Sequence, residues 1–173
     1  IHTAADFDYA SNLYFSDGAV ELAVNLMKSG RGFTIVTDTN MALAGVNKAA
    51  LKQLNGTVRC FMADPDVAAE AKERGVTRAI VSMERAATLA GPVIFAIGNA
   101  PTALIRLYEM MQNGEIHPDF IIGTPVGFVN VVESKELICQ SSVPCIVARG
   151  RKGGSNIAAA VCNALMYQVT RTQ

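Results

Sequence analysis

Short apolar runs alternate with stretches of helical spacing along this chain. Five runs are largely apolar and typical of strands, namely residues 33–37, 58–62, 93–97, 120–122 and 145–148. Helical spacing predicts helices over residues 17–29, 40–54 with a break near Gly45, 66–74, 78–89, 101–112, 129–140 and 155–168. Strands that are apolar on both faces are typical of a parallel sheet covered by helices on both sides. The pattern therefore predicts a single-domain, doubly wound α/β fold with a mainly parallel five-stranded sheet.

The chain shows no internal repeat, linker or shift of composition, so we expect one domain over residues 1–173. It begins at Ile1 without methionine, and we expect that a further N-terminal segment is missing. No signal peptide and no apolar run of about eighteen residues is visible, which favours a cytoplasmic protein without membrane contact. The predicted final helix is apolar on nearly all sides, as expected of a helix that is central in a core or covered by a second subunit.

The charge balance and the positions of cysteine and histidine argue against some classes of function. The 15 basic and 15 acidic residues balance to a net charge of zero, which argues against a nucleic-acid partner. The four cysteines form no closely spaced pair, and three lie inside apolar runs, so we interpret them as buried structural thiols. The two histidines, His2 and His117, are far apart in sequence, and we expect no metal site in the protein.

Three strand-to-helix junctions are rich in glycine, proline and small polar residues: 98–102, 123–128 and 149–155. A helix N-terminus presents unpaired backbone N–H groups and a partial positive charge, so each junction is a potential anion site. Each is also compatible with a tight turn that needs glycine. Because the carboxyl ends of parallel strands meet at one edge of a sheet, the three junctions together predict a pocket for a ligand with several carboxylates or phosphates.

Familiar nucleotide fingerprints do not fit these junctions. Neither the G-x-G-x-x-G pattern after a strand nor the G-x-x-x-x-G-K-[ST] pattern is present. A nucleotide-binding or phosphosugar-binding α/β enzyme therefore stays open only as an alternative.

Candidate catalytic groups are few. His2 lies in the cluster Ile1-His2-Thr3-Ala4-Ala5-Asp6-Phe7-Asp8, and an imidazole is suited to proton transfer near neutral pH. A histidine near a chain end is also compatible with a plain surface residue. His117 precedes Pro118 in a polar turn and is expected to be solvated. We expect Asp6 and Asp8 to cap a turn or to face solvent.

Four segments together carry a specific resemblance: residues 1–7, 98–104, 122–135 and 149–155. They resemble the precorrin-8X methylmutase family, which includes the cobalt-precorrin-8 form. The resemblance implies a cobalamin-pathway isomerase that moves a methyl group from carbon 11 to carbon 12 of ring C in precorrin-8 or cobalt-precorrin-8, giving hydrogenobyrinate or cobyrinate. The shift is intramolecular, so no cofactor is implied, and cobalt, if present, belongs to the tetrapyrrole substrate. A non-catalytic tetrapyrrole-binding protein is a further alternative.

The resemblance also implies roles for particular residues. His2 would be the catalytic proton donor. The implied substrate-binding residues are Thr3, Arg78, Asn99, Thr102, Gly123, Gly127, Phe128, Arg149 and Arg151. Surface charge for the arginines, and helix capping for Asn99 and Thr102, are the alternatives from the residues alone. The apolar final helix and the resemblance both favour a homodimer.

Overall fold

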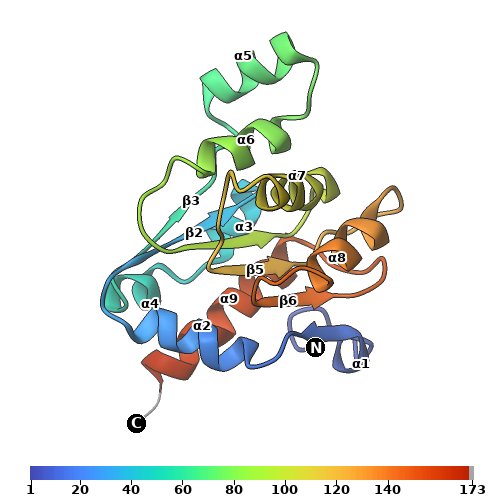
Figure 1. Ribbon diagram of the computed structural model, residues 1–173. Coiled ribbons are helices and arrows are strands. Elements are labelled where there is room, and N and C mark those ends of the chain that lie inside the picture. Colours follow the sequence, from blue (N-terminus) through green and yellow to red (C-terminus); the bar gives the residue numbers. More distant parts are fainter. Residues whose placement is uncertain (172–173) are drawn as a thin grey trace.

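The computed structural model describes residues 1–171 and forms one six-stranded sheet with helices on both faces (Figure 1). The strand order is β1-β6-β5-β4-β2-β3, and all neighbours are parallel except β1 and β6. The strands are β1 (Leu13–Phe15), β2 (Phe33–Thr37), β3 (Gly56–Arg59), β4 (Val93–Ile97), β5 (Phe120–Gly123) and β6 (Cys145–Ala148). The predicted doubly wound α/β fold is confirmed.

The sheet has one strand more than the five predicted. β1 runs antiparallel to β6, with Leu13 opposite Ala148 and Phe15 opposite Ile146. It has only three residues and stands between polar Asn12 and Ser16, so it shows neither a long apolar run nor a clear alternation. The second predicted strand also begins earlier than expected, because Gly56 pairs with Phe33 at the start of β2.

The predicted helices occur in order with shifted ends, and one further helix, the short α1, was not predicted. They are α1 (Tyr9–Asn12), α2 (Ala19–Lys28), α3 (Asn40–Gly45), α4 (Lys48–Gln53), α5 (Pro65–Arg74), α6 (Arg78–Ala86), α7 (Pro101–Gln112), α8 (Val131–Cys139) and α9 (Ser155–Thr170). The predicted helix over residues 40–54 is two helices, with the break near Gly45 as expected. Val46 is extended, and the Asn47 side chain then caps α4 by accepting the N–H groups of Ala49 and Ala50.

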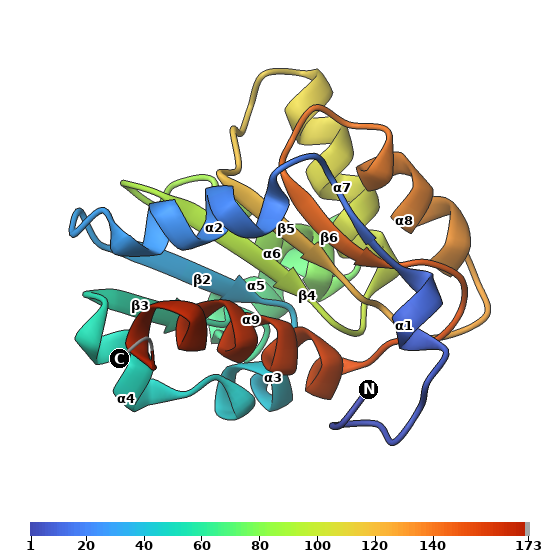
Figure 2. The same cartoon turned by 90° about the horizontal axis from the view of Figure 1, so that it is seen from below.

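Two apolar cores lie on opposite faces of the sheet. One core joins α5, α6, α7 and α8 to side chains such as Phe95 and Ile121, and in Figure 1 these helices lie above the sheet, with α5 packed outside α6. The other core joins α2, α4 and α9 to side chains such as Ile94 and Ile122. Figure 2 shows α9 crossing this second face beside α2. Within residues 1–171, no helix is both long and apolar enough to cross a membrane.

The winding reverses between β2 and β4. From β2 the chain moves outward to β3, and it then returns across β2 to build β4, β5 and β6 in the other direction. In open α/β sheets, ligands bind in the crevice outside the carboxyl ends of the strands at such a switch point. Asp38 follows β2 at this place, and Gly98 follows β4.

Candidate active site

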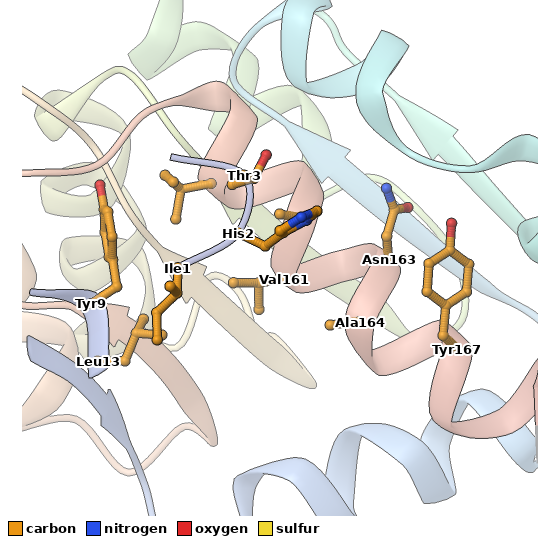
Figure 3. Close-up of a pocket in the computed structure, with 11 residues that line it drawn as sticks. Ile1, His2, Thr3, Tyr9, Leu13, Val161, Asn163, Ala164 and Tyr167 are labelled. Atoms are coloured by element: carbon orange, nitrogen blue, oxygen red, sulfur yellow. The ribbon is translucent and has the colours of Figure 1, made fainter. Parts of the chain in front are cut away.

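His2 lines a hollow with a volume of about 410 Å³. The hollow lies between residues 1–3, the α1–β1 segment and the outer face of α9. Figure 3 shows His2 over α9, between Thr3 and Asn163, with Tyr9 and Leu13 toward one end and Tyr167 at the other. The walls are mostly apolar and include Ile1, Leu13, Ile157, Ala160, Val161 and Ala164. An exposed imidazole over apolar walls is suited to act on a large, mostly apolar ligand.

A lysine ties the segment that carries His2 to the third junction. Lys152 Nζ donates to Asp6 Oδ2 at 2.7 Å and to Asp8 Oδ2 at 2.6 Å. These contacts lower the pKa of the Asp6 carboxyl, chiefly through the hydrogen bond from Lys152, and raise the pKa of Lys152. Within the segment, the Ile1 carbonyl accepts the N–H groups of Ala4 and Asp6, both at 3.3 Å. The expectation that Asp6 and Asp8 only cap or face solvent omitted this anchoring role.

Polar side chains at one end of the hollow are fixed by the turn between α3 and α4. Asn163 Oδ1 accepts the N–H of Asn47 at 2.8 Å, and Asn163 Nδ2 donates to the Gly45 carbonyl at 2.9 Å. Asn47 Nδ2 donates to Tyr167 Oη at 2.9 Å. Sequence reasoning missed Asn163 and Tyr167, although their i, i+4 spacing on a helix places them on one face.

Tyr9 was also missed, and it forms the opposite end of the hollow. Its side chain is buried, and burial raises the pKa of its phenol, with a smaller contribution from the negative charge of Asp6. Its signal in the sequence is only that an aromatic residue follows the His2 cluster, which is not specific.

The first junction is closed by a carboxylate of the chain itself. Asp38 Oδ1 accepts the N–H of Gly98 at 2.9 Å, and Asp38 Oδ2 accepts those of Asn99 and Ala100, both at 2.7 Å. Asp38 is fully buried, and burial raises the pKa of its carboxyl while the three N–H groups oppose that rise. The anion bound by the turn before α7 is therefore the Asp38 carboxylate. Its sequence signal, an aspartate directly after a buried strand, indicated only that the strand ends there.

The three junctions lie together, as their positions in the sequence predicted. An added Cβ at Gly98 would lie 2.6 Å from Ser155 Cα, so the first and third junctions touch through backbone. Gly154 N–H donates to the Thr124 carbonyl at 2.8 Å, which joins the third junction to the second. Thr39 Oγ1 and Ser155 Oγ are 2.7 Å apart, and this contact adds the N-terminus of α3 to the same cluster.

The second junction presents an apolar surface. Phe128 is 85% exposed, and Val126 and Val129 are also exposed. Arg151 Nη1 donates to the Phe128 carbonyl at 2.8 Å, and its guanidinium lies 5.9 Å from the centre of the Phe128 ring. Gly127 has a φ of +140°, a region that L side chains rarely adopt, and its N–H donates to the Arg151 carbonyl.

A buried lysine forms hydrogen bonds to the backbone of the third junction. Lys135, on α8, is fully buried, and its ammonium donates to the carbonyls of Gly150 and Lys152, both at 2.8 Å. Burial lowers the pKa of Lys135 to about 8. This lysine fixes the backbone of the loop whose side chains include Arg151 and Lys152.

The remaining expected substrate-binding residues lie at different places. Arg78 is exposed at the start of α6, and Thr102 is close to it, because Thr77 Oγ1 lies 3.3 Å from Thr102 Oγ1. Arg149 is paired with Glu136, with Nε 2.9 Å from Oε1, and stands over the Tyr14 ring. Gly123 is buried beside Leu104 and Val147. Of the expected substrate-binding residues, Thr3 alone lines the hollow of His2.

Comparison with known proteins places the chain in a family. The family model for precorrin-8X methylmutase matches residues 1–168. The cobalt-precorrin-8 methylmutase of Salmonella typhimurium is 43% identical over 170 residues, which cover 98% of this chain and 78% of that protein. The precorrin-8X methylmutase of Pseudomonas aeruginosa is 42% identical over 168 residues, covering 95% and 79%.

The fold agrees as well. A crystal structure of precorrin-8X methylmutase from Thermus thermophilus has a TM-score of 0.85 and 37% sequence identity, covering 96% of this chain and 80% of that one. With a match over nearly its whole length in sequence and in fold, the chain belongs to the precorrin-8X methylmutase family, the methyl-moving isomerases of cobalamin biosynthesis.

Proposed function

We propose that this isomerase moves the methyl group on carbon 11 of ring C of precorrin-8, or of its cobalt form, to carbon 12. The bond from the methyl group to carbon 11 breaks as the bond to carbon 12 forms, so the product is an isomer, hydrogenobyrinate or cobyrinate. No methyl donor enters the reaction. The observation that carries the proposal is the exposed imidazole of His2 over an apolar hollow, in a chain of this family.

His2 would donate a proton or a strong hydrogen bond to the macrocycle near ring C. That donation withdraws electron density from the conjugated ring and lowers the barrier to methyl migration, and the proton returns to the imidazole when the product has formed. The apolar walls around His2 support this role, because a hydrogen bond is stronger where water is excluded. Asn163 and Tyr167 are held at the other end of the hollow and would orient the ring.

The substrate is a flat ring with acetate and propionate arms, and it is wider than the hollow. Ring C would therefore occupy the hollow while the other rings extend along the carboxyl edge of the sheet. Arg78 and Arg151 would bind carboxylate arms there, Thr3, Asn99 and Thr102 would donate hydrogen bonds, and Gly127 and Phe128 would form an apolar wall. The exposure of Arg78 and Phe128 at this edge supports the assignment. Arg149 would have to leave Glu136 to take part, and buried Gly123 would act only by shaping its turn.

Turnover of a His2→Ala variant tests the acid role. We expect the variant to bind the corrinoid product as the wild type does and to lose turnover by roughly two to four powers of ten, the usual worth of general acid catalysis. His117→Ala is the matched control, because His117 is also exposed but lies in the loop before β5, at the opposite edge of the sheet. Unchanged turnover in His2→Ala would exclude the acid role.

Two simple assays decide the remaining alternatives. Metal-free and cobalt-loaded precorrin-8, assayed side by side, identify the natural form of the substrate. Methyl migration by the purified protein separates the isomerase from a tetrapyrrole carrier, and a lack of nucleotide affinity separates it from a nucleotide enzyme.

We also propose a homodimer that works in the cytoplasm. A second hollow of about 220 Å³ adjoins that of His2 and is lined by Leu13, Phe15, Val20, Ile146, Val161, Ala164, Leu165 and Gln168. Phe15 and Val20 are large apolar side chains that remain exposed, as expected of a surface covered by a second subunit. Light scattering at micromolar concentration is the test, and a monomer would contradict the proposal. The free thiols of all four cysteines are compatible with a reducing compartment.

A further inference from the structure

Asp38 occupies the place where a doubly wound sheet ordinarily binds its ligand. It directly follows β2, the turn that it binds directly follows β4, and β2 and β4 are the two strands between which the winding reverses. The turn that it binds leads into α7, a twelve-residue helix whose N-terminal end carries a partial positive charge. A substrate carboxylate would be expected at this position, and the carboxylate found there belongs to the protein.

The Asp38 carboxylate is bound by backbone N–H groups of the turn and not by a cationic side chain. Its two oxygens accept three consecutive N–H groups at 2.7–2.9 Å. Within residues 1–171, no lysine, arginine or histidine forms an ion pair with Asp38. The turn and the positive end of the α7 dipole therefore supply the stabilisation of this buried charge.

The turn that Asp38 binds is packed against the start of α9 on its other side, so it has little room to move. Gly98 lies against the backbone of Ser155, where a Cβ would be 2.6 Å from Ser155 Cα. Thr39, the neighbour of Asp38, meets the Ser155 hydroxyl at 2.7 Å. A shift of the turn would therefore move the start of α9, the helix that forms the floor of the hollow beneath His2.

We propose that Asp38 is a positioning residue for the methyl migration. Its carboxylate holds the turn of Gly98, Asn99 and Ala100 in the geometry that the substrate requires, and it keeps the N-terminus of α7 from binding a substrate carboxylate in the wrong place. The inference rests on the proposed function, because Asn99, whose own N–H is bound by Asp38, is among the residues assigned to the substrate.

Chemical rescue tests the proposal. In an Asp38→Ala variant, formate can enter the vacated space and accept the same three N–H groups. We expect kcat/KM to fall by about a hundredfold, the effect of a misplacement of about 1 Å at an active site, with most of the loss in kcat. Added formate should restore much of it and raise the melting temperature of the variant. Wild-type enzyme in the same formate should change in neither respect.

Asp119→Ala is the matched control. Asp119 Oδ2 also accepts a backbone N–H, that of Val93 at 2.8 Å, but at the opposite edge of the sheet. This variant should lose stability, keep the kcat of its folded fraction and show no response to formate. The control separates a general loss of stability from a loss of positioning.

The outcomes are distinguishable. Wild-type kcat and KM in folded Asp38→Ala, or a loss that formate does not relieve, would overturn the positioning role. If Asp38→Ala does not fold, Asp38→Asn serves, because its amide fills the same space and turns an NH₂ group toward one N–H. It should lose activity without a formate response, and wild-type kinetics there would equally overturn the role. Full turnover in His2→Ala, in contrast, would overturn the proposed function itself.

Discussion

Carboxylates hold two parts of the carboxyl edge in different ways. Asp38 is buried and binds three backbone N–H groups of the turn after β4. Asp6 and Asp8 bind the ammonium of Lys152 at the surface, and through it they hold the segment that carries His2. Buried, fully matched groups are costly to disturb, whereas exposed ion pairs contribute little to folding. The edge therefore combines a rigid frame with a segment, carrying His2, that is held more weakly.

Removal of the buried carboxylate should have the largest effect on stability. Asp38→Ala leaves three N–H groups without their partner in a buried place, and each unsatisfied group costs about 1–3 kcal/mol. We expect the free energy of unfolding to fall by at least about 3 kcal/mol, measured by urea denaturation without formate. A loss below about 1 kcal/mol would mean that water replaces the carboxylate. Asp38 would then contribute no more to stability than the surface contacts of Lys152 with Asp6 and Asp8.

Lys135 provides an intermediate case, since it is a buried charge that holds a surface loop. Burial lowers its pKa from the ordinary value of 10.5 to about 8, so the unfolded chain binds more protons between these two values. This group alone should therefore make the folded state more stable as the pH rises from about 8 to 10.5. Lys135→Met should lack that rise, and the difference between the two unfolding curves across this pH range measures it.

The opposite sign would mean that the folded state raises the pKa of Lys135, and it would contradict a pKa lowered by burial. Subtraction of the variant from the wild type also removes the contributions of the cysteine thiols, which both proteins share. Lys72→Met is a suitable control for the same substitution at a surface site, because Lys72 is exposed on α5.

Loss of the surface anchor should separate activity from stability. Lys152→Ala removes both contacts to Asp6 and Asp8, yet the free energy of unfolding should change little because all three groups are solvated. We expect kcat/KM to fall severalfold, since His2 is less well placed over the hollow. The test is to measure steady-state kinetics and thermal unfolding of the same variant. A large loss of stability would show that the anchor belongs to the rigid frame.

The smallest expected effect is the loss of the contact between Asp6 and Lys152 at acidic pH. The pKa of Asp6 is lowered below its ordinary value of 3.8, so its contribution is complete above that value and is lost as the pH falls through the lowered one. Resonances of the residues around His2, followed by NMR down this range, should move in the wild type and not in Asp6→Asn. Identical titrations of the two proteins would place the anchor elsewhere.

The sequence predicted what depends on local pattern. Residues 93–97 and 120–122 are apolar on both faces, and they became the central strands for that reason. The hydrogen bonds of Asp38 to the turn after β4 could not be predicted from the sequence. They require β2 and β4 to be neighbours in the sheet, and local sequence patterns do not show which strands pair. The same holds for Asn163 and Tyr167, whose importance depends on the turn of Asn47 packing against α9. The role of His2 was proposed from its motif and stays a prediction, while the anchor of its segment to Lys152 joins residues 144 or more positions apart.

The short first strand has a consequence for how the chain can be shortened. β1 covers the outer side of β6, and the Arg149 N–H donates to the Asn12 carbonyl just before it. Without the first fifteen residues, β6 would present a row of open backbone groups to other molecules, the usual start of edge-to-edge aggregation. The segment that carries His2 therefore also protects the protein from aggregation, and its deletion should reduce solubility as well as turnover.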